Sequence, residues 1–205
     1  MTWPIRIVLF AKAPLPGQAK TRLAPALGQA GAAKLAAAML DLALRQALAA
    51  DIGPVELCMS PAPGHAAWAD VVLASSVHTS DQGEGDLGAR LARAARRCIA
   101  NGEAVLLIGA DCPELDSARL RQAASRLAEH DAVLYRAHDG GYPLLGLTRF
   151  DARLFEAMPW STSAVADLTL ARLDRLGWKV WLGETLQDID EPADLAFLPA
   201  SLRPG

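Results

Sequence analysis

The sequence IRIVLFA at residues 5–11 is a short apolar run rich in β-branched residues, and a loop with Pro14, Pro16 and Gly17 follows it. This pattern is typical of a buried strand followed by a turn. Further along, residues 31–50 are mostly Ala, Leu and Met, a composition that favours a helix of about five turns. The amino-terminal part therefore predicts an interior strand that leads through a loop into a helix.

The same alternation continues along the chain. We expect strands at residues 55–59, 71–73, 104–109, 132–135, 144–147 and 178–182, and helices at residues 87–100, 118–129, 162–176 and 191–197. Strands that alternate with helices indicate a mostly parallel sheet with helices on both faces. No internal repeat or linker divides the 205 residues. The sequence therefore predicts one three-layer α/β/α domain over residues 1–205.

Composition and charge exclude several classes of protein. A hydrophobic fraction of 52% excludes a disordered chain, and a net charge of -3 lacks the basic excess that a nucleic-acid partner requires. The amino terminus has no signal-peptide pattern, and no uninterrupted apolar run approaches the ~20 residues that span a bilayer. We therefore expect a cytoplasmic protein with no membrane partner. Its three cysteines are odd in number and widely spaced, which suits neither a disulfide framework nor a CxxC zinc site.

Ligands of an open parallel sheet bind beyond the carboxyl ends of the strands. The loop after the first strand, residues 12–23, carries the cations Lys12, Lys20 and Arg22 together with Gly17. Such a set suits a pyrophosphate, because lysine supplies a point charge and arginine a bidentate fork. The loop lacks the glycines of a Walker motif. A solvated basic loop is an equally good interpretation of its composition.

An acidic residue follows the apolar run at residues 104–109. Asp111 at the end of a buried strand is costly to desolvate without a partner, and a hard cation is a natural one. The alternative is a helix cap, for which Asp116 and Ser117 are better placed. Asp111 is therefore a candidate metal ligand.

Two more acidic residues, Asp188 and Asp190, are separated by one position and point the same way if the segment is extended. One of them is a candidate second ligand of the metal. The alternative is that Asp190 caps a helix whose first residue is Pro192. The residues alone do not decide between these interpretations.

Two glycine-rich turns, at residues 81–88 and 138–142, let a ligand lie against the backbone, and Gln82 and Asp139 add polar groups there. Each turn alone is a weak signal. The GxSxG, HExxH and GxGxxG patterns are absent after suitable strands, which argues against a hydrolase of that type, a zinc protease and a dinucleotide enzyme.

Taken together in this order, several segments resemble a known family. They are FAKAP at residues 10–14, PGQAKTRL at 16–23, QGEGDLG at 82–88, IGADCP at 108–113, DGGY at 139–142, WST at 160–162 and DID at 188–190. They resemble the bacterial nucleotide-diphospho-sugar transferase-like proteins, also called radical-SAM/selenodomain-associated transferases. This family is assigned to glycosyltransferases of the GT-A fold and is similar to 2-phospho-lactate guanylyltransferases. The resemblance covers nearly the whole chain and implies this fold.

The resemblance also implies roles for individual residues. Nucleotide binding is expected of Lys12, Gly17, Lys20, Thr21, Arg22, Gln82, Gly85 and Asp86. Contact with the acceptor is expected of Arg136, Asp139, Gly140, Gly141 and Tyr142. A metal ion, Mg²⁺ or Mn²⁺, is expected on Asp111 with Asp190 as second ligand, and the catalytic groups are expected to be Asp111, Lys20 and Asp139.

The chain departs from the family around the acceptor loop. Relatives usually carry Gly-Pro where this chain has Tyr135-Arg136, and an aromatic residue in place of Pro143. The acceptor preference therefore does not transfer. Because Arg136 places a cation beside this loop, it is a candidate for recognising an anionic acceptor.

The function expected from these observations is a divalent-metal-dependent glycosyltransferase that uses a nucleoside diphosphate sugar and a small-molecule acceptor. One alternative is a nucleotidyltransferase that acts on a nucleoside triphosphate and a phosphorylated small acid. Another is a non-catalytic nucleotide-binding protein. The base, the sugar, the acceptor and the oligomeric state are not specified by the sequence.

Overall fold

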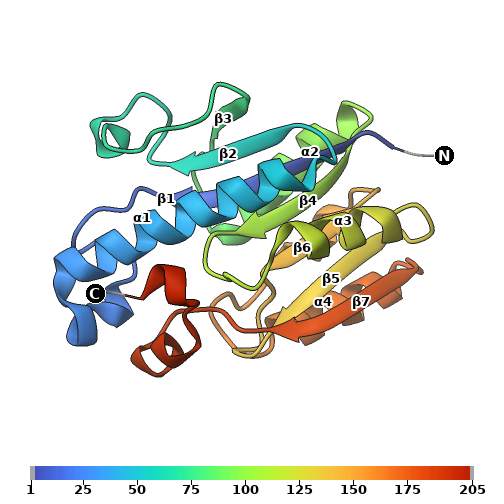
Figure 1. Ribbon diagram of the computed structural model, residues 1–205. Helices are drawn as coiled ribbons and strands as arrows, with labels where there is room; N and C mark the ends of the chain where they lie inside the picture. Colours follow the sequence, from blue (N-terminus) through green and yellow to red (C-terminus); the bar gives the residue numbers. More distant parts are fainter. Residues whose placement is uncertain (1–2, 204–205) are drawn as a thin grey trace.

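Strand β1 (Ile5–Lys12) lies in the interior of a seven-stranded sheet, as its apolar run predicts (Figure 1). The computed structural model describes residues 3–203. The strand order is β3-β2-β1-β4-β6-β5-β7. The other strands are β2 (Val55–Ser60), β3 (Val77–Asp81), β4 (Ala104–Gly109), β5 (Ala132–Ala137), β6 (Leu144–Leu147) and β7 (Val180–Leu186).

The sheet is parallel except for β6, which is antiparallel to both of its neighbours, β4 and β5. The carboxyl ends of β1, β4, β5 and β7 therefore meet at one edge of the sheet. The mostly parallel sheet predicted from the sequence is confirmed.

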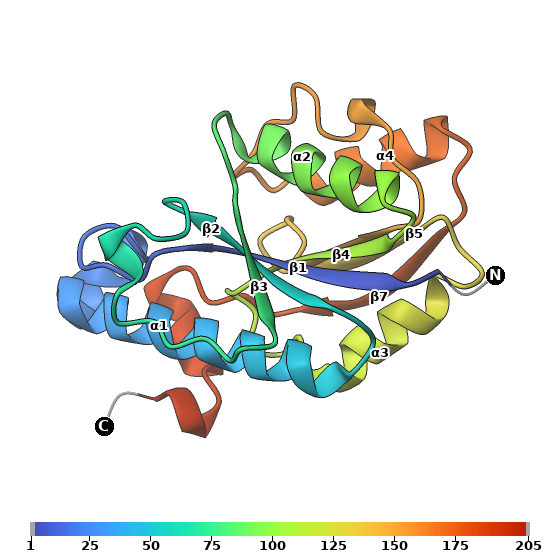
Figure 2. The same cartoon turned by 90° about the horizontal axis from the view of Figure 1, so that it is seen from above.

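Helices cover both faces of the sheet (Figure 2). Helices α1 (Ala24–Ala50) and α3 (Ser117–Arg126) lie on one face, and α2 (Leu87–Ala100) and α4 (Val165–Arg175) lie on the other. In β1, Ile7 and Leu9 pack with the first pair of helices, and Val8 packs with the second pair. A strand covered on both faces needs apolar side chains on both of them, which explains the unbroken apolar run at residues 7–11. The three-layer α/β/α arrangement is confirmed.

Short 3₁₀ helices lie in the connections. They are η1 (Thr21–Leu23), η2 (Ala66–Trp68), η3 (Ala152–Leu154), η4 (Pro192–Phe197) and η5 (Ala200–Leu202). Residues of η1 and α1 form a third apolar cluster with the segment after β7, through Leu23, Met39, Ile189 and Leu198. This cluster joins the loop after β1 to the carboxyl-terminal part of the chain.

The strand expected at residues 71–73 is wrong. This segment has no strand pairing, although Val71 and Leu73 pack against the core while Val72 is 93% exposed. The alternation reflects burial along an extended loop rather than pairing in the sheet. The edge strand is instead β3, whose sequence VHTSD lacks an apolar pattern.

Helix α1 begins earlier than residue 31, at Ala24, and Gly28 interrupts it with a left-handed φ of 70°. By length and composition the stretch Thr21–Ala50 is apolar enough to cross a membrane, with a mean hydropathy of 1.2 in one window. A count of uninterrupted apolar runs misses it, because polar residues such as Lys34 interrupt it. In this fold the helix lies along the sheet, where Leu40 and Leu44 join the core. The cytoplasmic location stays a prediction.

Candidate functional site

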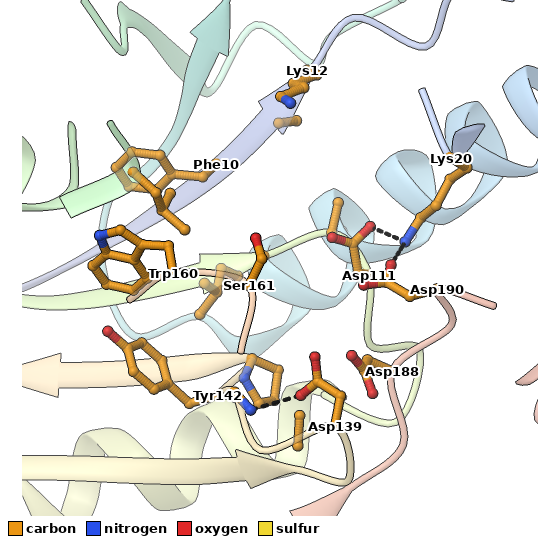
Figure 3. Close-up of a pocket in the computed structure, with 18 of the residues that line it drawn as sticks. Phe10, Lys12, Lys20, Asp111, Asp139, Tyr142, Trp160, Ser161, Asp188 and Asp190 are labelled. Carbon is orange, nitrogen blue, oxygen red and sulfur yellow. Dashed lines mark hydrogen bonds and ion pairs between the residues drawn. The ribbon is translucent and has the colours of Figure 1, made fainter. Parts of the chain in front are cut away.

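A cavity of about 690 Å³ opens at the carboxyl ends of the strands. Its volume falls in the range of about 300–1,000 Å³ that is usual for small-molecule sites. Figure 3 shows that its wall has two sides, one with Lys20 and the four acidic residues Asp111, Asp139, Asp188 and Asp190, the other with Phe10, Tyr142 and Trp160. The cavity therefore has a charged end and an apolar end.

Lys20 connects two loops at the charged end. Its ammonium group lies 2.5 Å from Oδ1 of Asp111 and 2.6 Å from Oδ1 of Asp190, and it also donates a hydrogen bond to the carbonyl oxygen of Ile189. Burial lowers the pKa of Lys20, but the two carboxylates outweigh it and raise the pKa above its ordinary value. The loop after β1 thus meets the acids that follow β4 and β7.

A backbone hydrogen bond links the segments that carry Asp111 and Asp190, and neither residue caps a helix. The amide of Ile189 donates to the carbonyl oxygen of Asp111 at 2.9 Å, so the segment after β7 is tied to the loop after β4. Helix α3 is capped by Asp116, and η4 is capped by Glu191. Capping therefore accounts for neither Asp111 nor Asp190.

Asp139, Asp188 and Asp190 form an acidic cluster in which one oxygen from each carboxylate lies within 4.8 Å of the others. Asp188 is only 9% exposed, and within the described residues the hydrogen bond that reaches its carboxylate comes from its own backbone amide. Burial, together with the negative charge of Asp139, raises the pKa of Asp188 to about 7. Three carboxylates this close together, of which Lys20 pairs only with Asp190, are suited to a hard divalent cation.

The apolar end is built from aromatic side chains. The rings of Tyr142 and Trp160 meet edge to face with centroids 6.5 Å apart. The hydroxyl of Tyr142 has Thr169, a buried residue of α4, as its hydrogen-bonding neighbour. Nε1 of Trp160 is buried against Gly88 and is without a hydrogen-bond partner in the part of the chain that the structure describes. The hydroxyl of Tyr142 is thus used within the fold, and Nε1 of Trp160 is buried away from the cavity.

The structure brings many of the predicted site residues to this cavity and leaves others outside it. Its wall includes Lys12, Lys20, Thr21, Arg22, Gln82, Asp111, Asp139, Gly141, Tyr142, Asp188 and Asp190. The residues that lie outside the wall are Gly17, Gly85, Asp86, Arg136 and Gly140.

Three of the predicted site residues make contacts within the fold. The amide of Gln82 donates to the carbonyl oxygens of Ala11 and Cys58, which ties β1 to β2. Asp86 caps α2. Arg136 is paired with Asp167 of α4. The structure thus gives Arg136 a partner within the chain, and its role toward an anionic acceptor stays a prediction.

Gly140 supports the site from behind the wall. It has a φ of +88°, and a Cβ there would overlap the carbonyl oxygen of Ser163. Only glycine lets the acidic loop with Asp139 approach the segment before α4 this closely. The loop and that segment therefore lie side by side at the cavity.

Residues that line the cavity without having been assigned from the sequence include Phe10, Leu87, Trp160 and Ser161. Trp160 and Ser161 stand in the WST segment, but their residue types alone carry no role. The grouping of Asp139 with Asp188 was also not predicted. Asp139 and Asp188 lie in segments that are far apart in the sequence. They become neighbours because β5 pairs with β7.

Comparison with known proteins places the chain among its relatives. The family model described as "Uncharacterized protein conserved in bacteria (DUF2064)" matches residues 43–162, which is more than half of the chain. The chain belongs to this family. The matched part of this DUF2064 protein includes Asp111 and Asp139, whereas Lys20 and Asp190 lie outside it. No curated protein sequence matches the chain.

Solved structures share the fold of this DUF2064 protein. A Desulfovibrio desulfuricans G20 protein provisionally named a nucleotide-diphospho-sugar transferase is 28% identical, with a TM-score of 0.86 over 97% of this chain and 87% of that one. CMP:2-keto-3-deoxy-manno-octonic acid synthetase in complex with CTP is 10% identical, with a TM-score of 0.59 over 94% and 95% of the two chains. Rv0371c from Mycobacterium tuberculosis H37Rv in complex with manganese is 21% identical, with a TM-score of 0.50 over 95% and 97%. The fold is that of nucleotide-diphospho-sugar transferases, as the resemblance predicts.

Proposed function

We propose that this protein is a divalent-metal-dependent glycosyltransferase that uses a nucleoside diphosphate sugar and a small-molecule acceptor. The contact of Lys20 with both Asp111 and Asp190 carries the proposal, because it joins a cationic loop to a carboxylate pair inside one cavity. The name and high similarity of the Desulfovibrio structure support the choice of a sugar donor.

The charge of the cavity supports a metal ion. Five acidic side chains line it against three basic ones, so a diphosphate would meet a net negative wall without a further cation. Asp139, Asp188 and Asp190 would hold the ion, and Asp111, the ligand expected from the sequence, shares the Lys20 ammonium group with Asp190. A bound Mg²⁺ or Mn²⁺ would supply Lewis-acid stabilisation of the leaving diphosphate. The manganese complex of Rv0371c supports this cofactor.

The chain's own residues would bind and orient the substrates. Lys12, Lys20 and Arg22 would contribute fixed positive charge to the phosphates. Asp139, at the tip of the loop after β5, would accept a hydrogen bond from a hydroxyl of the sugar or the acceptor. No covalent intermediate with the protein is required.

A nucleotidyltransferase is the second candidate. CMP:2-keto-3-deoxy-manno-octonic acid synthetase, a nucleotidyltransferase, has the same fold and was solved with CTP, which favours a nucleoside triphosphate in this position of the fold. The same cations and carboxylates would then act on a triphosphate, and the acceptor would be a phosphorylated small acid.

Product analysis separates these candidates. The protein is incubated with Mn²⁺ and either nucleoside triphosphates or nucleotide sugars, together with pools of candidate acceptors. Release of a nucleoside diphosphate from a nucleotide sugar is the expected result. Release of pyrophosphate from a triphosphate would establish the second candidate. Binding of nucleotides without any turnover would instead identify a non-catalytic nucleotide-binding protein.

A further inference from the structure

We propose that the apolar end of the cavity binds a hydroxyl-bearing aromatic ring of the acceptor. This inference rests on the proposed function, because it assigns the donor to the charged end. The apolar wall is defined by Phe10, Leu87, Leu91, Tyr142, Trp160 and Val165.

Five separate parts of the fold contribute to the apolar wall, one of them the segment before α4, which carries Trp160. Phe10 lies near the end of β1, Leu87 and Leu91 lie on α2, Tyr142 precedes β6, and Val165 begins α4. Figure 3 shows the rings of Phe10, Trp160 and Tyr142 on one side of the cavity, facing away from Lys20 and the acids. The three rings therefore lie on the opposite side of the cavity from the charges.

The carbon faces of these rings, and not their polar atoms, are presented to the cavity. The hydroxyl of Tyr142 is directed toward Thr169, and Nε1 of Trp160 is buried against Gly88. A Cβ at residue 88 would lie 2.8 Å from Nε1 of Trp160 and 2.5 Å from the carbonyl oxygen of Phe155. Glycine at this position therefore lets the Trp160 ring approach α2 closely.

A sugar or a nucleobase can stack on Tyr142 and Trp160, and its polar edges are what distinguish it from an apolar ring at this wall. Sugar hydroxyls and base edges need hydrogen-bonding partners when they are buried, and leaving such groups unpaired costs free energy. Leu87, Leu91 and Val165 offer none. Leu87 is 44% exposed, so an apolar ring that covers it gains hydrophobic burial.

Ser161 explains why the ring should carry a hydroxyl. In Figure 3 its side chain lies between Trp160 and the carboxylates. A hydroxyl on a ring held by the wall would point toward Ser161 and the acids, where the transfer to the acceptor would occur. The proposed ligand class is therefore a phenol or an aromatic alcohol.

Calorimetric titration with 2-naphthol tests the proposal, with myo-inositol as the polar probe. We expect the metal-free protein to bind 2-naphthol and not myo-inositol. Trp160→Ala should weaken 2-naphthol binding by about tenfold or more, because one face of the ring loses its contact. Leu87→Ser should weaken it by several-fold, and this exposed position keeps the test open if Trp160→Ala fails to fold. Leu168→Ser is the matched control, because Leu168 is a similarly exposed helical leucine outside the cavity.

Nucleotide binding in Mn²⁺ is measured on the same variants. We expect it to be unchanged in Leu87→Ser and Trp160→Ala. If these variants weaken nucleotide binding as much as 2-naphthol binding, the wall holds the base and the proposal is overturned. Preferential binding of myo-inositol, or 2-naphthol binding that neither variant changes, also overturns it. If no nucleotide binds the parent while 2-naphthol binding depends on the wall, the proposed function fails and the apolar site stands.

Discussion

Lys20 combines a costly backbone conformation with a central position in the site. Its φ of 50° and ψ of 42° are left-handed, a region that costs a residue with a Cβ about 1–2 kcal/mol. The side chain is nevertheless only 8% exposed, because its ammonium group lies between two carboxylates. Strain of this kind persists where the surroundings hold the residue in place, and it clusters at functional sites.

Two substitutions of Lys20 distinguish the cost of its backbone conformation from the contribution of its side chain to nucleotide binding. Lys20→Ala should weaken nucleotide binding about 10- to 100-fold, because it leaves Asp111 and Asp190 without the cation that pairs with them, and charge-assisted hydrogen bonds of this kind are worth roughly 1.5–3 kcal/mol. Lys20→Gly should bind equally weakly and yet be more stable than Lys20→Ala, since glycine tolerates the left-handed backbone. Titration calorimetry and urea denaturation measure the two effects, with Lys34→Ala as the control on the surface of α1. Unchanged nucleotide affinity in both variants would remove Lys20 from the site.

We expect the Asp188 carboxylate to lower the stability of the metal-free protein and to strengthen metal binding. Its raised pKa of about 7 means that folding takes up a proton between the ordinary value of 3.8 and 7, so this group lowers stability as the pH rises through that window. Asp188→Asn should therefore stabilise the metal-free protein, and more at pH 8 than at pH 5. The same change should weaken Mn²⁺ binding, since one ligand is lost.

Urea denaturation in EDTA at both pH values, and titration with Mn²⁺, check the two effects. Asp174→Asn on the exposed face of α4 is the control. A variant that is less stable than the parent at pH 8 would contradict the view that burial and the nearby carboxylates raise the pKa of Asp188.

At the scale of elements, the sequence predicts buried segments better than edges. The expected ranges 87–100 and 104–109 coincide with α2 and β4, because an amphipathic helix and a strand buried on both faces have clear patterns. Strand β3 has no such pattern, since an edge strand with partly exposed residues such as His78 and Thr79 needs little apolar sequence.

Some residues of the candidate site could likewise be predicted from the sequence, and others could not. Asp111 and the loop with Lys20 could be predicted, because each directly follows an interior strand and the carboxyl ends of parallel strands meet. The cluster of Asp139 with Asp188, and the wall around Trp160, depend on which distant segments become neighbours. That information lies in the order of the strands, and local patterns do not contain it.

A charged network joins β2 to the neighbouring elements. Glu56 is 2% exposed, is paired with Arg97 of α2 and Arg6 of β1, and accepts a hydrogen bond from Ser80 of β3. Burial alone raises the pKa of Glu56, but the hydrogen bonds from Arg97 and Ser80 outweigh it and lower the pKa below 4.5. The ionised carboxylate therefore stabilises the fold.

Glu56→Gln should lower the free energy of unfolding by about 1.5–3 kcal/mol at pH 7. Because the pKa is lowered in the folded state, this contribution is present above pH 4.5 and is lost as the pH falls below it. The difference from the parent should accordingly narrow in acid. Urea denaturation across this pH range measures it, and Glu129→Gln, an exposed position, is the control. A constant difference at every pH would show that lost packing and not charge is responsible.

At the scale of the whole molecule, the site joins the two ends of the chain. The loop after β1 supplies Lys20, and the segment after β7 supplies Asp190. Beneath them, Leu23 and Met39 pack against Ile189 and Leu198. A ligand that bridges the charged end therefore links segments that separate on unfolding, so its binding should stabilise the entire fold.

Thermal denaturation should reveal this linkage as a dependence on both metal and nucleotide. A ligand at about 100 times its Kd adds about 2.7 kcal/mol to the folded state, which is roughly 5–11 °C in Tm for a chain of this size. Because the acidic residues outnumber the basic ones in the cavity, a diphosphate should give this shift in Mn²⁺ and a much smaller one in EDTA. Asp188→Asn, which removes one negative charge, should reduce the shift in Mn²⁺ and should not reduce the residual shift in EDTA. An equal shift of the parent in Mn²⁺ and in EDTA would mean that the phosphates are held without a cation, and the metal-dependent proposal would then be wrong.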